Sequence, residues 1–242
     1  MKKAAIIPAR LESQRLPRKL LKPLLNKPLI QWVYENTKNF GVFDSIHVAT
    51  DSKEIEKVCL DFGCKVIITG KDHESGTSRL SEAIKSIEAD IIVNIQGDEP
   101  FIKTHQINSL ITNLISSENS SIATLVVPSK DYEGSCNPNI VKAVKDTDNN
   151  ALYFSRLAIP YNRENPNNGQ WFHHMGVYAY KRSFLENYPN LKESYLEKVE
   201  KLEQLKFLAN GYKILLVETN EKTIGIDTEE DFKQALEIFK NR

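Results

Sequence analysis

Two adjacent carboxylates, Asp98 and Glu99, stand just after a short apolar run at residues 91–93. Because Gly97 and Pro100 end this stretch, it predicts a buried strand of a parallel sheet followed by a turn. In open α/β sheets ligands bind beyond the carboxyl ends of the strands, so acids in this position can hold a divalent cation against a phosphorylated substrate. A solvated turn is the alternative, since Asp, Gly and Pro are common turn residues.

A basic segment follows the first apolar run of the chain, residues 4–7, which Pro8 closes. Ten positions from Arg10 carry four cations and one acid: Arg10, Glu12, Arg15, Arg18 and Lys19. Cations in a loop after a first strand can neutralise the oxygens of a triphosphate from several sides. Residues 9–19 contain no glycine, which excludes the glycine fingerprints of Walker and Rossmann phosphate loops. A charged surface loop that binds nucleic acid is the alternative.

A third segment, residues 72–79, combines small polar residues with His73 and Arg79. Its composition permits a tight loop whose backbone donors and guanidinium face a base or a phosphate. His73 could ligate or donate, although a histidine in a turn is more often simply exposed. Taken alone, the segment is a weak indication of a binding site.

The elements that must position these residues alternate in type. Strands are predicted at residues 4–7, 45–50 and 65–69, with helices at 28–40 and 53–62 between them, and this βαβαβ order specifies a parallel sheet. Asp51 or Ser52 is expected to cap the second helix. Further on we expect an amphipathic helix through residue 87, a helix at 104–115 and a strand at 122–128.

The second half of the chain has a different pattern. Two alternating runs at residues 140–145 and 151–155 flank a turn-rich segment and predict a β-hairpin, so antiparallel structure is added to the parallel core. Residues 161–170 are rich in Asn, Pro and Gly and predict a mobile loop. A helix at 196–208, a strand at 213–217 and a helix at 228–239, capped by Asp227 or Thr228, complete the prediction.

The bulk composition limits the class of protein. The 242 residues suit one large α/β domain, and the 32 basic residues equal the 32 acidic ones, which does not favour nucleic acid or an acidic membrane as partner. The three cysteines form neither a CxxC pair nor a zinc motif, which favours a reducing, cytoplasmic setting. The apolar run before Pro8 is too short for a signal peptide, and no later run approaches about 18 apolar residues, the length that spans a membrane.

Eight groups of motifs, spread in order over nearly the whole chain, closely resemble the CMP-Kdo synthetases, the family of 3-deoxy-manno-octulosonate cytidylyltransferases. The groups are Ile7-Pro8-Ala9-Arg10 with Arg15-Leu16-Pro17 and Lys19; Val48-Ala49-Thr50-Asp51; Asp72-His73-Glu74-Ser75-Gly76-Thr77 with Arg79; Val93-Asn94-Ile95-Gln96-Gly97-Asp98-Glu99-Pro100; Tyr153-Phe154-Ser155-Arg156 with Ile159-Pro160; His174-Met175-Gly176-Val177-Tyr178-Ala179-Tyr180; Leu202-Glu203-Gln204-Leu205; and Ile226-Asp227-Thr228.

The resemblance implies transfer of a cytidylyl group from CTP to the eight-carbon sugar acid Kdo, which gives CMP-Kdo and pyrophosphate and activates Kdo for lipopolysaccharide assembly. It implies Mg²⁺ as cofactor and a homodimer. The implied fold is a Rossmann-like nucleotidyltransferase sheet, mostly parallel but mixed, with a smaller antiparallel sugar-side and dimerisation subdomain. In a single domain of 242 residues, residues 1–128 would be the nucleotide-binding half, 129–226 the sugar-binding portion and 227–242 a returning helix.

The resemblance also implies roles for individual residues. The catalytic residues would be Arg10, Lys19, Asp98 and Asp227, of which Asp98 and Asp227 would hold Mg²⁺. The nucleotide would be bound by Pro8, Ala9, Arg10, Arg15, Lys19, Ser75, Gly76, Thr77, Arg79 and Asp98. The sugar would be bound by Gln96, Arg156, His174, Tyr178, Glu203 and Gln204.

Physical reasoning agrees with these roles. A Mg²⁺ ion between Asp98 and Asp227 could lower the pKa of the sugar's anomeric hydroxyl and align it with the α-phosphate, so that no protein base is strictly needed. Arg10 and Lys19 would meet the charge that develops on the phosphates. Arg156 could pair with the sugar carboxylate through a bidentate fork.

Three positions depart from the family pattern. Arg18 replaces the usual glycine before the loop lysine, Leu20 replaces the usual proline after it, and Ser78 replaces the usual acid before Arg79. These departures leave the transfer reaction in place but bear on base and sugar preference. A related enzyme class uses the 8-amino analogue of Kdo, and this substrate remains open.

Other readings remain. A cytidylyltransferase for another acidic sugar, such as sialic acid, would differ around Arg156 and His174. A nucleotide sensor without turnover would not need both Asp98 and Asp227. A nucleic-acid binder would need a basic face and salt-sensitive affinity, and an NAD-dependent oxidoreductase would need a GxGxxG motif after the first strand, which is missing.

Overall fold

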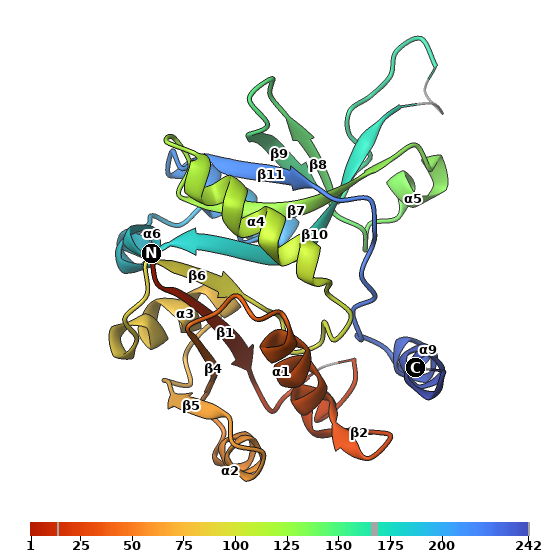
Figure 1. The fold of residues 1–242 in the computed structure, drawn as a ribbon. Helices are drawn as coiled ribbons and strands as arrows, with labels where there is room; N and C mark the ends of the chain where they lie inside the picture. The colour runs from red at the N-terminus through yellow and green to blue at the C-terminus, as the bar shows by residue number, and fades with distance from the viewer. Residues whose placement is uncertain (14, 166–168, 242) are drawn as a thin grey trace. The chain divides into compact units, whose positions relative to one another are not determined.

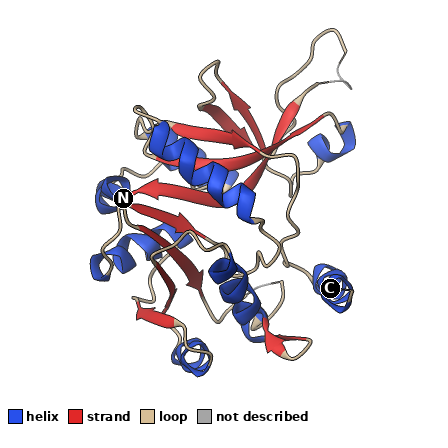
Figure 2. Cartoon of the chain, in the orientation of Figure 1, coloured by secondary structure: helices blue, strands red, loops and turns tan. Residues whose placement is uncertain are grey.

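The computed structural model describes residues 1–13, 15–165 and 169–241. The chain forms two compact units, which are described separately below. The first unit contains Met1–Asn108 and Thr223–Arg242, and the second contains Ser109–Lys222. Figure 1 follows the chain along its length, and Figure 2 shows its helices and strands.

The first unit is built on a four-stranded parallel sheet with the order β6-β1-β4-β5. Its strands are β1 (Lys3–Ala9), β4 (Ser45–Thr50), β5 (Lys65–Ile68) and β6 (Ile91–Asn94). In β1, Ile6 pairs with His47 of β4 on one side and with Asn94 of β6 on the other. The chain therefore moves outward from β1 to β5 and then returns to β6 on the opposite side of β1, which makes the β1/β6 boundary a topological switch point.

Helices connect these strands, as the sequence predicts. They are α1 (Leu29–Asn39), α2 (Lys53–Asp61) and α3 (Gly76–Ala83), and α9 (Glu229–Lys240) closes the unit. Ser52 caps α2 by accepting a hydrogen bond from the Ile55 N–H, and Thr228 caps α9 in a capping box with Asp231. Short elements complete the unit: η1 (Lys19–Leu21), β2 (Pro23–Leu24), β3 (Lys27–Pro28) and η2 (Ile84–Ser86). Helix α4 (Thr104–Ser116) runs across the boundary between the units along the chain.

The second unit is a mixed sheet with the order β11-β7-β10-β8-β9. Its strands are β7 (Ile122–Ser129), β8 (Lys142–Lys145), β9 (Ala151–Ser155), β10 (Trp171–Lys181) and β11 (Ile214–Glu218). Only the β11–β7 pair is parallel among these pairings of the described strands. Strand β7 belongs to this unit because it pairs with β10 and β11. The family resemblance had instead assigned residues 1–128, which include most of β7, to the nucleotide-binding half.

Short helices and an aromatic cluster complete the second unit. The helices are α5 (Tyr132–Cys136), α6 (Arg182–Asn187), η3 (Tyr188–Asn190), α7 (Tyr195–Glu200) and α8 (Gln204–Ala209). The Phe184 ring contacts the rings of Tyr180, Phe207 and Tyr212 at centroid distances of 4.9–5.4 Å. Such contacts bury large apolar area and anchor the helices on β10.

The predicted α/β class with a mostly parallel sheet is confirmed, but several details differ. The helix predicted at residues 196–208 is wrong as one element, because Lys201 has a positive φ of 54° and separates α7 from α8. The predicted loop at 72–79 is too long, because α3 already begins at Gly76. Strand β10 and helices α5 and α6 were not predicted. Part of the loop predicted at 161–170, residues 166–168, lies outside the described residues.

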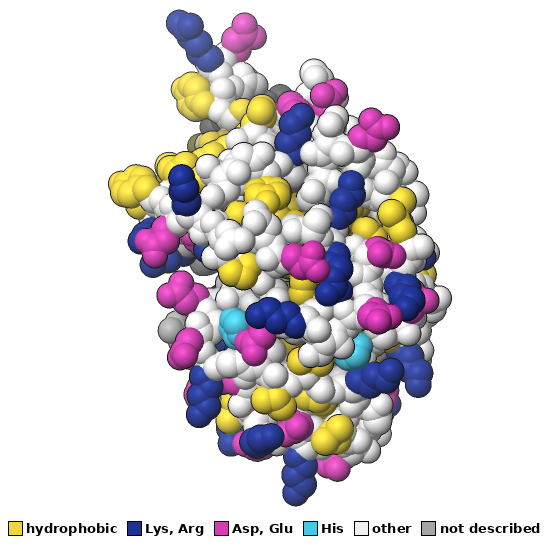
Figure 3. Space-filling view, turned by 90° about the vertical axis from the view of Figure 1, so that its left-hand side faces the viewer, with side chains coloured by type: hydrophobic (Ala, Val, Ile, Leu, Met, Phe, Trp, Pro, Cys, Tyr) yellow, Lys and Arg dark blue, Asp and Glu magenta, His cyan; other side chains and the backbone are white. Residues whose placement is uncertain are grey.

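The surface and the cysteines agree with the composition. Lys and Arg side chains are interspersed with Asp and Glu over the face shown in Figure 3. Among the described helices, none has the length and apolar character needed to cross a bilayer. Cys59, Cys64 and Cys136 are free, and burial raises the pKa of the Cys59 and Cys64 thiols to about 12, so both are chemically inert.

Candidate active site

A polar pocket of about 250 Å³ lies in the first unit, where β1 and β6 end at the switch point. Its position is the one at which open α/β sheets bind ligands. Gly97 leaves room for Leu20 against the loop after β6, because a Cβ on this residue would lie 3.0 Å from the Leu20 side chain. This first pocket is lined by Pro8, Arg10, Glu12, Ser13, Arg15, Lys19, Leu20, Gln96, Gly97, Asp98 and Asp227.

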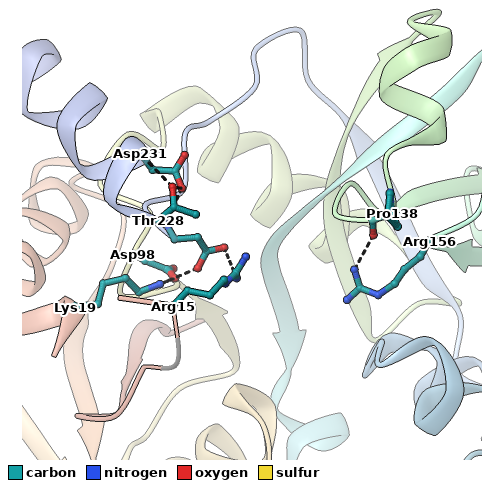
Figure 4. A network of polar contacts seen from close by, with 8 residues as sticks. Arg15, Lys19, Asp98, Pro138, Arg156, Thr228 and Asp231 are labelled. Atoms are coloured by element: carbon teal, nitrogen blue, oxygen red, sulfur yellow. Dashed lines mark hydrogen bonds and ion pairs between the residues drawn. The ribbon is translucent and has the colours of Figure 1, made fainter. Parts of the chain in front are cut away.

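Four charged side chains meet in the first pocket (Figure 4). The Lys19 ammonium donates to Asp98 Oδ2 at 2.5 Å and to Asp227 Oδ1 at 2.9 Å, and Arg15 pairs with Asp227 Oδ2 at 2.8 Å. Burial lowers the pKa of Lys19, but the two carboxylates together outweigh this effect and raise it above its ordinary value. Lys19 therefore remains a cation between two anions.

Backbone contacts hold the two carboxylates together, although they lie far apart in the sequence. The Ile226 N–H donates to the Asp98 carbonyl oxygen at 2.9 Å. This hydrogen bond holds Ile226, the residue before Asp227, against the loop that follows β6. Asp227 itself precedes α9, and its N–H donates to the Asp231 side chain at 3.0 Å. The capping box of α9 thus also orients Asp227.

Glu99 holds the segment that leads to Asp227 in place. Its Oε2 accepts a hydrogen bond from the Thr223 hydroxyl at 2.8 Å, and a Cβ on Gly225 would lie 3.1 Å from its Oε1. Burial, and then the charge of Asp98, raise the pKa of Glu99 to about 7. The sequence drew attention to this acid without assigning it a role, and here it positions the segment that leads to Asp227.

The pair of carboxylates fits a divalent cation. Both Asp98 and Asp227 direct an oxygen at one point, which the Lys19 ammonium occupies as a stand-in cation. Within the described residues, no group of three or more His, Cys, Asp and Glu side chains could hold a metal. Two carboxylates suit Mg²⁺, because this ion usually completes its shell with waters and substrate phosphates.

A second pocket of about 160 Å³ adjoins the first and shares Pro8, Arg10 and Gln96 with it. Ser75 accepts a hydrogen bond from the Ser78 N–H and caps α3, so this pocket meets the N-terminus of a helix, where anions are stabilised. The second pocket is lined by Pro8, Ala9, Arg10, His73, Glu74, Ser75, Gly76, Arg79 and Gln96.

The Arg79 guanidinium already has partners within the protein. It pairs with Asp51 at 3.1 Å and donates to the Thr69 hydroxyl at 2.5 Å, while the residue as a whole is only 5% exposed. Thr77 is buried and lies outside the lining of both pockets. We infer that Arg79 shapes the second pocket, because it lines this pocket and holds Thr69 and Gly70 ahead of α3.

His73 closes the same loop onto α3. Its Nε2 lies 2.5 Å from Glu82 Oε2, and its Nδ1 lies 2.7 Å from the Ser78 hydroxyl. Contacts with the Gly70 N–H and with His73 lower the pKa of Glu82, so this carboxylate is an acceptor and the Nε2 of His73 carries the proton. His73 is therefore held on both nitrogens, in contrast to the exposed turn histidine that is commoner.

In the second unit, two cations organise the segment around Arg156. The Arg156 guanidinium donates to the carbonyl oxygen of Glu200 at 2.8 Å. It also donates to the carbonyl oxygen of Pro138 at 2.9 Å (Figure 4). Lys142 is fully buried, and its ammonium donates to the carbonyl oxygens of Asn137, Ile140 and Arg156. The sequence did not single out Lys142, because an alternating run gives no signal that a lysine lies inward.

The remaining predicted sugar-binding residues of the second unit lie on β10 and at the start of α8. His174 Nε2 lies 2.8 Å from the Tyr178 hydroxyl, and burial lowers the pKa of His174 to about 3 and raises that of Tyr178. Glu203 accepts a hydrogen bond from the Tyr188 hydroxyl at 2.8 Å. Gln204 is 6% exposed, and its Nε2 has no hydrogen-bond partner among the residues that the structure describes.

The predicted nucleotide residues are thus largely brought together in the first unit. Arg10, Arg15, Lys19, Asp98 and Asp227 line the first pocket with Gln96, and Gln96 lines the second pocket as well, although the family resemblance placed it near the sugar. Glu12 and Ser13 line the first pocket without having been predicted. Their only signal is their position in the basic segment.

Fold and pocket define an α/β protein with a pocket lined by Lys, Arg and Asp side chains at the switch point of a parallel sheet. Residues 4–214 match the sequence profile described as Cytidylyltransferase, and the chain belongs to this cytidylyltransferase family. It is 44% identical to the 3-deoxy-manno-octulosonate cytidylyltransferase of Francisella tularensis subsp. tularensis over 97% of both chains. It is 42% identical to the enzyme of the same name from Koribacter versatilis, over 100% of this chain and 92% of that one.

Solved structures agree with this membership. The chain resembles CMP:2-keto-3-deoxy-manno-octonic acid synthetase complexed with CTP, with a TM-score of 0.94 and 39% identity, over 100% of this chain and 99% of that one. It resembles HddC from Yersinia pseudotuberculosis with a TM-score of 0.72 and 20% identity, over 99% of this chain and 100% of that one, which is a likeness of fold alone.

Proposed function

We propose that this protein transfers the cytidylyl group of CTP to 3-deoxy-manno-octulosonate and releases pyrophosphate. The observation that carries the proposal is the meeting of Lys19, Asp98 and Asp227 in one pocket at the switch point. The 44% identical relatives that bear the name of this activity support it.

The chain's own groups suit the phosphate chemistry. Arg10 lines both pockets, so it can contact a nucleotide whose phosphates enter the first pocket and whose nucleoside lies in the second. Arg15 and Lys19 add positive charge where pyrophosphate would depart, and cations held in place before the reaction stabilise such charge. The Ser75 cap presents the N-terminus of α3 to the same ligand.

We include Mg²⁺ in the proposal, held by Asp98 and Asp227. When bound there, the ion supplies Lewis-acid activation of the attacking sugar hydroxyl and neutralises phosphate charge. Lys19, which bridges both carboxylates, and Arg15, which pairs with Asp227, would exchange these contacts for the β- and γ-phosphates. Glu99 keeps the segment before Asp227 in place through Thr223.

We assign sugar recognition to the second unit. Arg156 supplies a guanidinium for the sugar carboxylate, although its present contacts with main-chain oxygens must be exchanged in part for the ligand. His174 with Tyr178, and Glu203 with Gln204, supply hydrogen bonds to sugar hydroxyls. Because burial keeps His174 neutral, it serves as a hydrogen-bonding group rather than as a charge.

We further propose a cytoplasmic homodimer. Large apolar side chains are exposed on β9 and α7, with Leu152 at 61%, Tyr195 at 78% and Val199 at 60%. Ser155 and Arg156 at the end of β9 both bond to Glu200 at the end of α7, so these elements are adjacent. A second copy of the chain is the proposed partner, and Val199→Glu should shift the protein towards monomer in sedimentation equilibrium.

The test is pyrophosphate release in the presence of Mg²⁺. CTP is compared with the other nucleoside triphosphates, and each is crossed with Kdo, 8-amino-Kdo and sialic acid. Release with CTP and Kdo alone supports the proposal, and release with CTP and another sugar corrects the acceptor. If folded protein releases no pyrophosphate with any pair of substrates, the enzyme proposal is wrong and the nucleotide-sensor interpretation is favoured.

A further inference from the structure

Lys19 occupies the position that the proposed cation needs. Its ammonium lies 2.5 Å from Asp98 Oδ2 and 2.9 Å from Asp227 Oδ1, so it bridges the two carboxylates (Figure 4). The Lys19 side chain is only 9% exposed, whereas those of Asp98 and Asp227 are 27% and 44% exposed, so the bridge is buried on the lysine side and open to solvent on the carboxylate side. A metal ion cannot contact the same two oxygens while the ammonium remains there.

Charge leads to the same conclusion. The carboxylates of Asp98 and Asp227 contribute two negative charges, and Lys19 and Arg15 contribute two positive charges at contact distance. A divalent cation added to this cluster would bring two uncompensated positive charges into a partly buried site. A triphosphate removes the excess, because it carries about four negative charges and can accept the displaced ammonium.

The local structure allows Lys19 to change partners. Its backbone is held in η1, since its N–H donates to the Leu16 carbonyl oxygen at 3.1 Å and its own carbonyl oxygen accepts from Lys22 at 3.2 Å. The ammonium sits at the end of a flexible four-carbon stem, so it can move while the backbone stays fixed. The first pocket, which Lys19 lines, offers the space for the phosphates.

We propose that Lys19 is an internal competitor of the metal, and that the nucleotide relieves the competition by drawing its ammonium onto the triphosphate. The metal then binds weakly to the free protein and strongly together with the nucleotide. Metal and triphosphate binding are positively coupled through one side chain. This inference rests on the proposed function, since it takes the metal and the triphosphate as ligands of the first pocket.

The experiment measures Mn²⁺ binding by the electron paramagnetic resonance signal of the free ion, without nucleotide. Lys19→Met should bind Mn²⁺ on the order of ten to one hundred times more tightly than the wild type, the range expected for removal of one charge-assisted contact. Lys22→Met is the matched control, because Lys22 is nearby but pairs with Glu229, and it should leave the affinity unchanged. Adding Asp98→Asn to Lys19→Met should abolish the gain.

Saturating CTP should then strengthen Mn²⁺ binding by a larger factor in the wild type than in Lys19→Met. Equal Mn²⁺ affinity of the wild type and Lys19→Met without nucleotide would overturn the inference, as would a gain that survives Asp98→Asn. If Lys19→Met does not fold, as judged by circular dichroism, Lys19→Gln replaces it. Pyrophosphate release by the wild type is scored separately, so failure of the proposed function is distinguished from failure of the competition.

Discussion

Acid should destabilise the protein through two adjacent histidines of β10. Burial lowers the pKa of His174 to about 3 and that of His173 to about 4, from an ordinary value of 6.5. His174 Nε2 lies 2.8 Å from the Tyr178 hydroxyl, and a neutral ring nitrogen can accept a hydrogen bond from this hydroxyl whereas a protonated one cannot. Both rings are therefore neutral in the folded protein at neutral pH.

The sign and the size of the effect follow from proton binding. Below pH 6.5 the unfolded chain protonates both histidines, whereas the folded chain does not until about pH 4 for His173 and about pH 3 for His174. The unfolded state then binds more protons, so the free energy of unfolding falls as the pH falls. At pH 5.0, which is 1.5 units below the unfolded pKa, each histidine costs about 2 kcal/mol at ~1.4 kcal/mol per unit.

The assay is urea-induced unfolding at pH 7.5 and pH 5.0. His174→Gln keeps an acceptor for Tyr178 but cannot be charged, so its loss of stability between the two pH values should be smaller than that of the wild type by about 2 kcal/mol. His105→Gln removes an exposed histidine of α4 and serves as the control. Imidazole resonances of His174 should not titrate between pH 7.5 and pH 5.0.

The reasoning is refuted if His174→Gln and the wild type lose the same free energy of unfolding on acidification. It is also refuted if the His174 resonances titrate near pH 6.5 in the folded protein. Titration near pH 6.5 would mean that water reaches this ring in the folded protein.

Three further predictions concern catalysis, packing and nucleotide affinity. Asp98→Asn and Asp227→Asn should each lower pyrophosphate release about 100-fold while circular dichroism shows folded protein, and near-normal activity would remove the shared-cation mechanism. Lys142→Met should lower the free energy of unfolding by about 2–4 kcal/mol in urea, because three carbonyl oxygens lose a charged donor while one desolvated charge is removed; no loss would contradict that role. Ser78→Ala should raise the KM for CTP roughly fivefold with little change in kcat, because one hydrogen bond to His73 is worth about 1 kcal/mol; an effect on the sugar KM alone would argue against it.

Local patterns were sufficient for much of the first unit. The apolar runs that became β1 and β6 are short and bounded by turn residues, and the cap at Ser52 has the residue type and position that caps require. Because the carboxyl ends of parallel strands meet at one edge, the basic segment and Asp98 could be expected at a common site.

The second unit was harder to predict for identifiable reasons. Strand β10 contains His173 and His174 and an irregularity in its pairing before Tyr178, so its pattern does not alternate cleanly. The break between α7 and α8 depends on the left-handed backbone of Lys201, a conformation that lysine rarely adopts. Neither feature has a reliable signal in the sequence.

The sequence by itself determined the strand-to-loop order that places cations after β1 and carboxylates after β6, because these depend on neighbouring residues. Only the tertiary structure decided that Lys19 bridges Asp98 and Asp227, since Lys19 and Asp227 are 208 positions apart in the sequence. The contact depends on the backbone hydrogen bond from the Ile226 N–H to the Asp98 carbonyl oxygen. The tertiary structure likewise decided that Arg79 is held by Asp51 and Thr69. Spacing along a chain predicts which groups can reach a site, whereas burial and competing partners decide which of them remain available to a ligand.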